Sequence, residues 1–188
     1  MEQSDLLKYT AIQLLQLKIP YAVVGSFASS IWGESRLTQD IDIVVDLSLV
    51  HVPQICAAFP APEFYVSSSA VHEAIEQASQ FNVINPSSGN KLDFMVAGRT
   101  AWQREQLTRS RQAPIFPNLS VSVAAPEDVI LGKLIYYRDG ESEKHLRDIV
   151  GILDQSGPLI DREYLDQLAK QLGVDILWEA ILNSRRSA

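Results

Sequence analysis

Apolar residues in the first part of the chain recur with two different spacings. Leucines within residues 4–18 follow helical intervals, which predicts a helix that Pro20 ends. Apolar runs then predict a strand over residues 21–25, a short helix over 26–32 and a second strand over 40–46. The chain therefore begins with alternating helices and strands.

The middle of the chain continues this alternation. The pattern predicts helices over residues 49–59, 71–78 and 100–111, and strands over 81–85, 91–96 and 121–123. The polar loop Pro86–Asn90 joins two of these strands in a predicted hairpin.

From Pro126 onward the pattern is helical throughout. It predicts helices over residues 126–137, 142–153, 161–172 and 176–183. The sequence therefore predicts an α/β sheet domain over residues 1–125, followed by a helical subdomain over residues 126–188.

Composition is typical of a soluble globular protein. Of the 188 residues, 46% are hydrophobic and 21% are charged, and no apolar run approaches the ~20 residues that a membrane span requires. The single cysteine, Cys56, cannot form an internal disulfide, and the first residues lack the basic start of a secretory signal. We therefore expect a cytoplasmic protein without a membrane partner. The net charge of −7 argues against a generally basic nucleic-acid-binding surface.

Two aspartates stand one residue apart in the predicted strand over 40–46. Because side chains alternate along a strand, Asp40 and Asp42 should point to the same face, where they repel each other unless a cation lies between them. Earlier, Gly25-Ser26 forms a strand-to-helix turn whose backbone N–H groups are suited to an anion. Together these features indicate a divalent-metal site opposite a phosphate-binding turn. The alternative is a sheet edge whose carboxylates prevent aggregation.

These residues carry a family resemblance. Gly25-Ser26, thirteen intervening residues and then Asp40-Ile41-Asp42-Ile43 resemble the signature of the DNA polymerase β-like nucleotidyltransferase superfamily. Asp93, in the apolar run Lys91–Val96, stands where that family has its third carboxylate. The motif Arg36-x-Thr38-x-Asp40-Ile41-Asp42 and the helical stretch after Pro126 are similar to those of the AbiEii-like and minimal nucleotidyltransferases of bacteria and archaea.

The resemblance covers residues 20–153 and implies both a fold and a metal site. The implied fold is α/β (α+β), a small mixed sheet with helices and a nucleotide bound against the C-terminal helices. It also implies that Asp40, Asp42 and Asp93 are catalytic and hold two Mg²⁺ ions, which prefer carboxylate oxygens. One metal would bind the phosphates of an NTP, and the other would activate the attacking hydroxyl, with Asp93 as general base.

The resemblance also implies nucleotide-binding residues beyond Gly25 and Ser26. Lys133 stands among apolar neighbours at helical spacing, where a lone charge is costly. The family resemblance implies a contact to the triphosphate, and without nucleotide we expect its partner to be one of the three aspartates or a bound anion. The alternative is that its side chain extends to solvent. Arg36 and Thr38 are expected either to contact phosphates or sugar, or to order the entrance of the strand.

Three further residues lie in the helical part. Arg138, Lys144 and Asp148 resemble charged helical motifs of AbiEii-like proteins. For Lys144 and Asp148 we prefer the alternative of an ordinary ion pair four residues apart on one helix.

The sequence thus predicts a Mg²⁺-dependent nucleotidyltransferase that moves a nucleoside monophosphate from an NTP to a hydroxyl. The acceptor, whether RNA, protein or a small molecule such as an aminoglycoside, is left open. The AbiEii-like resemblance implies that the protein is a toxin-type enzyme with an antitoxin partner. The alternatives are a catalytically inactive module of the same fold that binds nucleotide, and an antitoxin-like or regulatory module that binds a partner protein.

Overall fold

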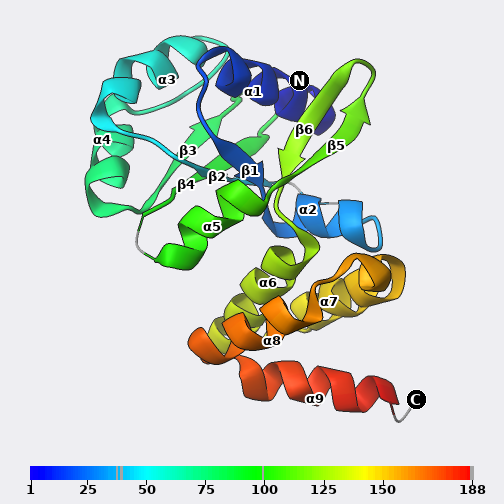
Figure 1. Cartoon of the computed structure of the whole chain (residues 1–188). Coiled ribbons are helices and arrows are strands. Elements are labelled where there is room, and N and C mark those ends of the chain that lie inside the picture. Colours follow the sequence, from blue (N-terminus) through cyan, green and yellow to red (C-terminus); the bar gives the residue numbers. More distant parts are fainter. Residues whose placement is uncertain (37, 39, 99, 187–188) are drawn as a thin grey trace. The chain divides into compact units, whose positions relative to one another are not determined.

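A computed structural model describes residues 1–36, 38, 40–98 and 100–186 (Figure 1). Among the helices in these ranges, none is both long enough and apolar enough to cross a membrane.

The chain forms two compact units. The sheet unit comprises Met1–Val24 and Leu37–Ala124, and the helical unit comprises Gly25–Arg36 and Ala125–Ala188. The polypeptide leaves the sheet unit after its first strand, contributes one short helix to the helical unit, and then returns. The hydrophobic pattern alone groups residues 25–36 with the sheet, whereas the structure groups them with the C-terminal helices.

The sheet unit contains a mixed sheet of six strands in the order β3-β4-β2-β1-β6-β5 (Figure 1). The strands are β1 (Tyr21–Val23), β2 (Asp40–Val45), β3 (Gln80–Ile84), β4 (Lys91–Val96), β5 (Arg111–Phe116) and β6 (Leu119–Val123). β2 runs parallel to β4 and β1 runs parallel to β6, whereas the β1–β2, β3–β4 and β5–β6 pairs are antiparallel. The predicted α/β class with a mixed sheet is confirmed.

Helices complete the sheet unit. They are α1 (Gln3–Gln16), α3 (Val52–Ala58), α4 (Ser68–Gln77) and α5 (Ala101–Arg109), with a 3₁₀ turn over Leu49–His51 before α3. α4 contacts β3 and β4, and α5 contacts β1 and β2. The side-chain oxygens of Ser67 and Thr100 accept backbone N–H groups of the first turns of α4 and α5, which explains where these helices begin.

Strand β5 is the element that the hydrophobic pattern does not predict. The helix predicted over 100–111 ends at Arg109, and Arg111–Phe116 pairs with β6 instead. Pro114 lies inside this strand and has no N–H to donate, which a sheet tolerates at its edge. β5 is the outer strand of the sheet, so its place in the order explains why the proline is accepted there.

Alternation along β2 and β4 separates an apolar face from a polar one. Ile41, Ile43, Leu92 and Phe94 are fully buried on one face, and Phe94 stacks on Phe81 of β3 with ring centroids 5.0 Å apart. A slip of one residue would move this apolar set to the other face, so the buried face fixes the register of both strands.

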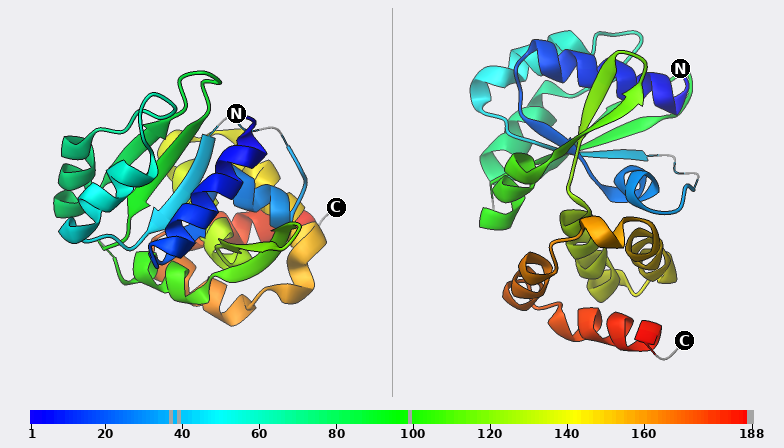
Figure 2. Two further views of the ribbon diagram at one scale, coloured as in Figure 1. Left: turned by 90° about the horizontal axis from the view of Figure 1, so that it is seen from above. Right: turned by 45° about the vertical axis from the view of Figure 1, so that its right-hand side comes forward.

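The helical unit combines one short helix with four C-terminal ones. Its members are α2 (Gly25–Trp32), α6 (Pro126–Gly140), α7 (Glu143–Ser156), α8 (Arg162–Gln171) and α9 (Asp175–Arg186). α2 contacts α6 and α7, and α6 contacts α7 and α8. α9 contacts α8 (Figure 2). The indole of Trp178 on α9 is buried.

Gly33, directly after α2, lies against the backbone of α7. A Cβ atom at this position would lie 2.7 Å from the backbone nitrogen of Ile152 and 2.8 Å from the carbonyl carbon of Gly151, so only glycine fits. The hydroxyl of Ser156 on α7 donates to the carbonyl of Trp32 at 2.5 Å. These contacts attach α2 to the helical unit.

Candidate active site

The three aspartates singled out from the sequence lie on two adjacent parallel strands. The register of β2 and β4 places Asp42 opposite Asp93 and Asp40 opposite Lys91. Residues paired in this way point to the same side of a sheet, and the other side of both strands is the buried apolar core. Asp40, Asp42 and Asp93 therefore share one polar face, which we call the carboxylate face.

Lys91 is a counter-ion of the carboxylate face. Its Nζ lies 2.9 Å from Oδ2 of Asp93 and 3.7 Å from Oδ2 of Asp40. The hydrogen bond to Asp93 raises the pKa of Lys91, and the charges of the three aspartates raise it further, although burial opposes the shift. The other carboxylate oxygen of Asp93 accepts the amide N–H of Asn82 on β3. Both carboxylate oxygens of Asp93 therefore accept hydrogen bonds within the sheet unit.

The carboxylate face has the donor chemistry of a divalent-cation site but is not arranged as one. Carboxylate oxygens are the ligands that Mg²⁺ prefers. Within the described ranges, no group of three or more His, Cys, Asp or Glu side chains is gathered so that it could hold a metal ion. Lys91 and Asn82 both donate to Asp93, and the ammonium of Lys91 would compete with a metal ion for that carboxylate. The residue types therefore fit Mg²⁺, whereas the expected number of two ions stays a prediction.

Gly25 and Ser26 begin α2 in the helical unit. Gly25 has φ of +62°, a left-handed conformation that glycine adopts without steric cost. The hydroxyls of Ser29 and Ser30 donate to the carbonyl oxygens of Gly25 at 2.9 Å and of Ser26 at 3.1 Å. Because the first N–H groups of a helix lack acceptors within the helix, this turn has the features expected of an anion-binding N-terminus.

A buried group of charges lies beside Ser26. Nζ of Lys133 on α6 lies 2.7 Å from Oδ2 of Asp148 on α7, and these side chains are 3% and 5% exposed. Arg36 holds the same carboxylate with two N–H donors, Nε to Oδ1 at 2.8 Å and Nη2 to Oδ2 at 2.9 Å. The Oγ atom of Ser26 accepts from Nη2 of Arg36 at 2.5 Å and from Nζ of Lys133 at 3.3 Å. We call these four residues the buried ion cluster.

Pairing keeps the buried ion cluster ionised. Burial would raise the pKa of Asp148, but the hydrogen bonds and charges of Arg36 and Lys133 outweigh it, so the pKa is lowered. The hydrogen bond to Asp148 in turn raises the pKa of Arg36. Two cations therefore share one carboxylate, and the cluster has an excess of one positive charge.

His145 on α7 borders the buried ion cluster. Its ring stacks on that of Tyr136 with centroids 5.8 Å apart. Burial lowers its pKa most, and the charges of Lys133 and Lys144 lower it further. The imidazole is therefore neutral at pH 7 and adds no charge to the cluster.

Two expectations about these residues are wrong. Lys133 does not extend to solvent, since its side chain is 3% exposed, and Asp148 is a carboxylate partner that the sequence did not predict for it. Asp148 does not form the predicted pair with Lys144, because its carboxylate binds Arg36 and Lys133.

Two of the other predicted residues have local roles in the structure. The hydroxyl of Thr38 donates to the carbonyl of Asp40 at 3.2 Å and so orders the entrance of β2, one of its two expected roles. The guanidinium of Arg138 donates to Asp139 and to the carbonyl of Leu172 at the end of α8.

The central position of Asp148 is what the sequence interpretation missed. Its neighbours Ile149 and Ile152 are fully buried, so Asp148 stands beside an apolar stripe of α7. A carboxylate in such a place needs a buried cation. The same argument singled out Lys133, and it could have singled out Asp148.

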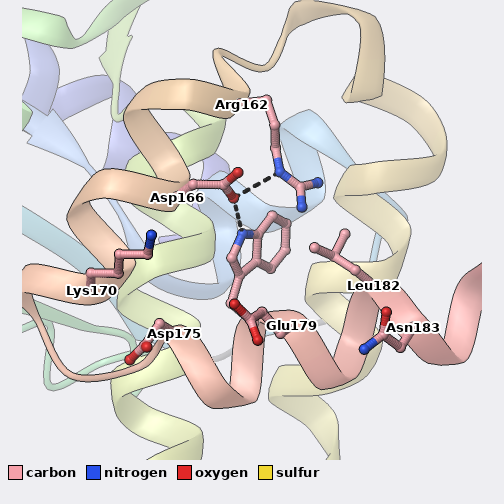
Figure 3. Close-up of a pocket in the computed structure, with 8 residues that line it drawn as sticks. Arg162, Asp166, Lys170, Asp175, Glu179, Leu182 and Asn183 are labelled. Atoms are coloured by element: carbon pink, nitrogen blue, oxygen red, sulfur yellow. Dashed lines mark hydrogen bonds and ion pairs between the residues drawn. The ribbon is translucent and has the colours of Figure 1, made fainter.

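A pocket of about 290 Å³ lies between α8 and α9 (Figure 3). In its wall, Nε of Arg162 and the indole N–H of Trp178 both donate to Oδ1 of Asp166, at 2.8 and 2.6 Å. The guanidinium of Arg162 lies 4.5 Å from the centroid of the Trp178 ring. These contacts join α8 to α9, and no residue singled out from the sequence lines this pocket.

Solved structures show which fold the chain has. No protein-family model matches the sequence, and no curated protein matches it. A crystal structure of ANT(2")-Ia in complex with adenylyl-2"-tobramycin is similar, with a TM-score of 0.61, 14% identity and coverage of 90% of this chain and 96% of that one.

Two further solved structures are similar to this chain in fold. An antigenic nucleotidyltransferase-like protein from Paracoccidioides brasiliensis has a TM-score of 0.56 and 19% identity, with 95% of this chain and 91% of that one covered. The lincosamide antibiotic adenylyltransferase LnuA, in its lincomycin-bound crystal structure, has a TM-score of 0.51 and 13% identity, with 81% and 96% covered. The chain therefore has the nucleotidyltransferase fold that its Gly-Ser and Asp-x-Asp motifs indicate.

Proposed function

We propose that this protein is a Mg²⁺-dependent nucleotidyltransferase that moves a nucleoside monophosphate from an NTP to a hydroxyl acceptor. The observation that carries the proposal is the register of β2 and β4, which gives Asp40, Asp42 and Asp93 one common face within a nucleotidyltransferase fold. A sheet edge that only prevents aggregation does not account for the third carboxylate on the neighbouring strand.

The two sets of residues have different proposed roles. Asp40, Asp42 and Asp93 would hold Mg²⁺, which when bound neutralises phosphate charge and lowers the pKa of the acceptor hydroxyl. The turn at Gly25 and Ser26 and the cations of the buried ion cluster would bind the triphosphate, since the cluster has an excess positive charge.

The proposed reaction is a single displacement at phosphorus. The acceptor oxygen forms a bond to the α-phosphorus, and the bond from that phosphorus to the oxygen of pyrophosphate breaks. The proton of the acceptor hydroxyl passes to the carboxylate of Asp93 as general base. Nζ of Lys91, 2.9 Å from Oδ2 of Asp93, would compete for that oxygen.

A small molecule with hydroxyl groups is the acceptor class that the similar structures favour. One contains adenylyl-2"-tobramycin and another is bound to lincomycin. The kinship with AbiEii-like enzymes, a toxin-type activity on RNA or protein, and an antitoxin partner remain predictions from the sequence alone.

Transfer of label tests the proposal directly. The protein would be incubated with Mg²⁺, each of the four α-³²P-labelled NTPs, and aminoglycosides, lincosamides, total RNA or protein as acceptors. We expect Mg²⁺-dependent labelling of a hydroxyl-bearing acceptor and release of pyrophosphate. Absence of NTP binding with Mg²⁺ would refute the proposal.

A second candidate is a nucleotide-binding module without turnover. The ion pairs of Lys91 with Asp93 and Asp40 favour it, because they occupy two of the carboxylates that catalysis requires. This candidate predicts NTP binding without incorporation into any acceptor.

A further inference from the structure

We infer that Asp148 is a positioning residue for triphosphate binding, acting through Lys133, Arg36 and Ser26. The inference rests on the proposed function and adds a residue that touches no substrate in that proposal. Its basis is the geometry of the buried ion cluster, all of which belongs to the helical unit.

The first argument concerns the charge of Lys133. An ammonium that is 3% exposed is strongly desolvated, and without a counter-ion a buried lysine loses its proton. Asp148 supplies that counter-ion at 2.7 Å. A neutral amine attracts phosphate far less than an ammonium does, so the affinity of Lys133 for an anion depends on Asp148.

The second argument concerns the orientation of two cations. Arg36 approaches Asp148 with two parallel N–H donors, a geometry that fixes the plane of the guanidinium. The same Nη2 atom that donates to Asp148 also donates to Oγ of Ser26, as does Nζ of Lys133. Asp148 therefore holds both cations where they meet Ser26.

The third argument concerns the hydroxyl of Ser26. A serine hydroxyl has two acceptor lone pairs and one hydrogen. Arg36 and Lys133 use the two lone pairs, so the hydrogen is left to donate, and none of the described residues accepts it. The cluster thus makes Ser26 a donor at the start of α2, which is the role that a phosphate oxygen requires.

A double-mutant cycle tests the inference. The dissociation constant of inorganic triphosphate with Mg²⁺ would be measured by calorimetry for the wild-type protein, Asp148→Asn, Lys133→Met and the double variant. We expect Asp148→Asn to weaken binding by about tenfold or more in the wild-type background, but by less than about threefold when Lys133 is already Met. Asp148→Glu, which keeps the charge, should recover part of the loss.

Controls separate this role from a general effect on folding. Asp154, on the same helix, pairs with Arg185 at 2.5 Å and is about half exposed, so Asp154→Asn should bind triphosphate as the wild-type protein does. An equal loss for Asp148→Asn in both backgrounds would overturn the inference, because a structural defect does not depend on Lys133. If Asp148→Asn does not fold, Asp148→Glu replaces it. Its longer side chain shifts the carboxylate relative to Lys133 and Arg36, so triphosphate affinity should fall below that of the wild-type protein, and an equal affinity would overturn the inference.

The outcome also distinguishes this inference from the proposed function. If the wild-type protein binds triphosphate and Asp148→Asn binds it equally well, the inference is wrong and the proposed function stands. If the wild-type protein binds neither triphosphate nor any NTP with Mg²⁺, the proposed function is wrong and the inference is overturned with it.

Discussion

The carboxylate face of the sheet unit and the buried ion cluster of the helical unit both combine aspartates with cations, but in opposite proportions. On the carboxylate face three aspartates share Lys91, which is one-third exposed, and this leaves an excess of negative charge. In the buried ion cluster a single aspartate holds two cations, which leaves an excess of positive charge. The first arrangement suits a ligand cation and the second suits a ligand anion.

Exposure separates the two regions further. Water screens an exposed ion pair, so such pairs contribute little to stability. Removing one partner of a buried pair leaves a charge without compensation, which destabilises the fold strongly. Substitutions on the carboxylate face should therefore change ligand binding alone, whereas substitutions in the buried ion cluster should change binding and stability together.

The largest effect on function is expected for Asp42→Asn. Loss of this carboxylate should lower Mg²⁺-dependent NTP binding and reduce turnover by at least about a hundredfold. The melting temperature should stay unchanged or rise slightly, because the substitution relieves repulsion between close carboxylates. Calorimetry with NTP and Mg²⁺, transfer of label and thermal unfolding measure these three quantities.

Asp46→Asn is the matched control for Asp42→Asn. Asp46 directly follows β2 and is exposed, so this variant should keep both turnover and stability. A large loss of stability in Asp42→Asn would mean that the carboxylate face is structural, and the transferase proposal would lose its main support.

The second effect is expected for Lys133→Met. Methionine keeps the packing of the side-chain stem and removes the charge, which should weaken triphosphate binding by about 1.5–3 kcal/mol. Unlike Asp42→Asn, this variant should also lose about 1–3 kcal/mol of unfolding free energy, because Asp148 then keeps only Arg36 as a cationic partner in the cluster. Calorimetry and urea unfolding test both parts.

Lys170→Met controls for the loss of a lysine in the same unit. Lys170 is exposed on α8, and its replacement should leave triphosphate binding unchanged. Triphosphate binding by Lys133→Met that equals the wild type would remove Lys133 from the proposed nucleotide-binding residues.

Local patterns explain how much of the carboxylate face could be predicted from the sequence. Asp40 and Asp42 alternate with Ile41 and Ile43, and an alternating strand has one polar face wherever it lies in the sheet. Strand β5 could not be predicted in the same way, because Pro114 interrupts its pattern and pairing with β6 stabilises it.

The buried ion cluster depends on long-range contacts that a local pattern does not show. Lys133 and Asp148 each stand on an apolar helix stripe, which predicts only that each needs a partner of opposite charge. Their mutual pairing depends on how α6 packs on α7, and the Arg36 contact spans 112 positions of the chain. A local pattern therefore favours Lys144, a lysine four residues away on the same helix, as the partner of Asp148.

Acid titration gives a third test of the comparison. Because the pKa of Asp148 is lowered in the folded protein, its carboxylate contributes stability above the unfolded-state value of about 3.9. That contribution is lost as pH falls through the lower folded value. The difference in unfolding free energy between the wild-type protein and Asp148→Asn should thus be constant from about pH 7 to 5 and shrink below about pH 4. Urea unfolding at several pH values measures it, and a difference that does not begin to shrink below about pH 4 would contradict a role for the charge.

The smallest effect is expected for Lys91→Met. Its ammonium lies 2.9 Å from Asp93 and 3.7 Å from Asp40, so a divalent cation must compete with it for both carboxylates. Removal of the ammonium should raise Mn²⁺ affinity by about three- to tenfold, while unfolding free energy changes by less than about 1 kcal/mol because the pair is partly exposed. Calorimetric titration with Mn²⁺ and thermal unfolding test this prediction, and Lys8→Met, at an exposed position of α1, is the control.

Weaker Mn²⁺ binding by Lys91→Met would mean that Lys91 orients the carboxylates rather than competing with the metal. A stability loss as large as that of Lys133→Met would abolish the distinction between the partly exposed carboxylate face and the buried ion cluster.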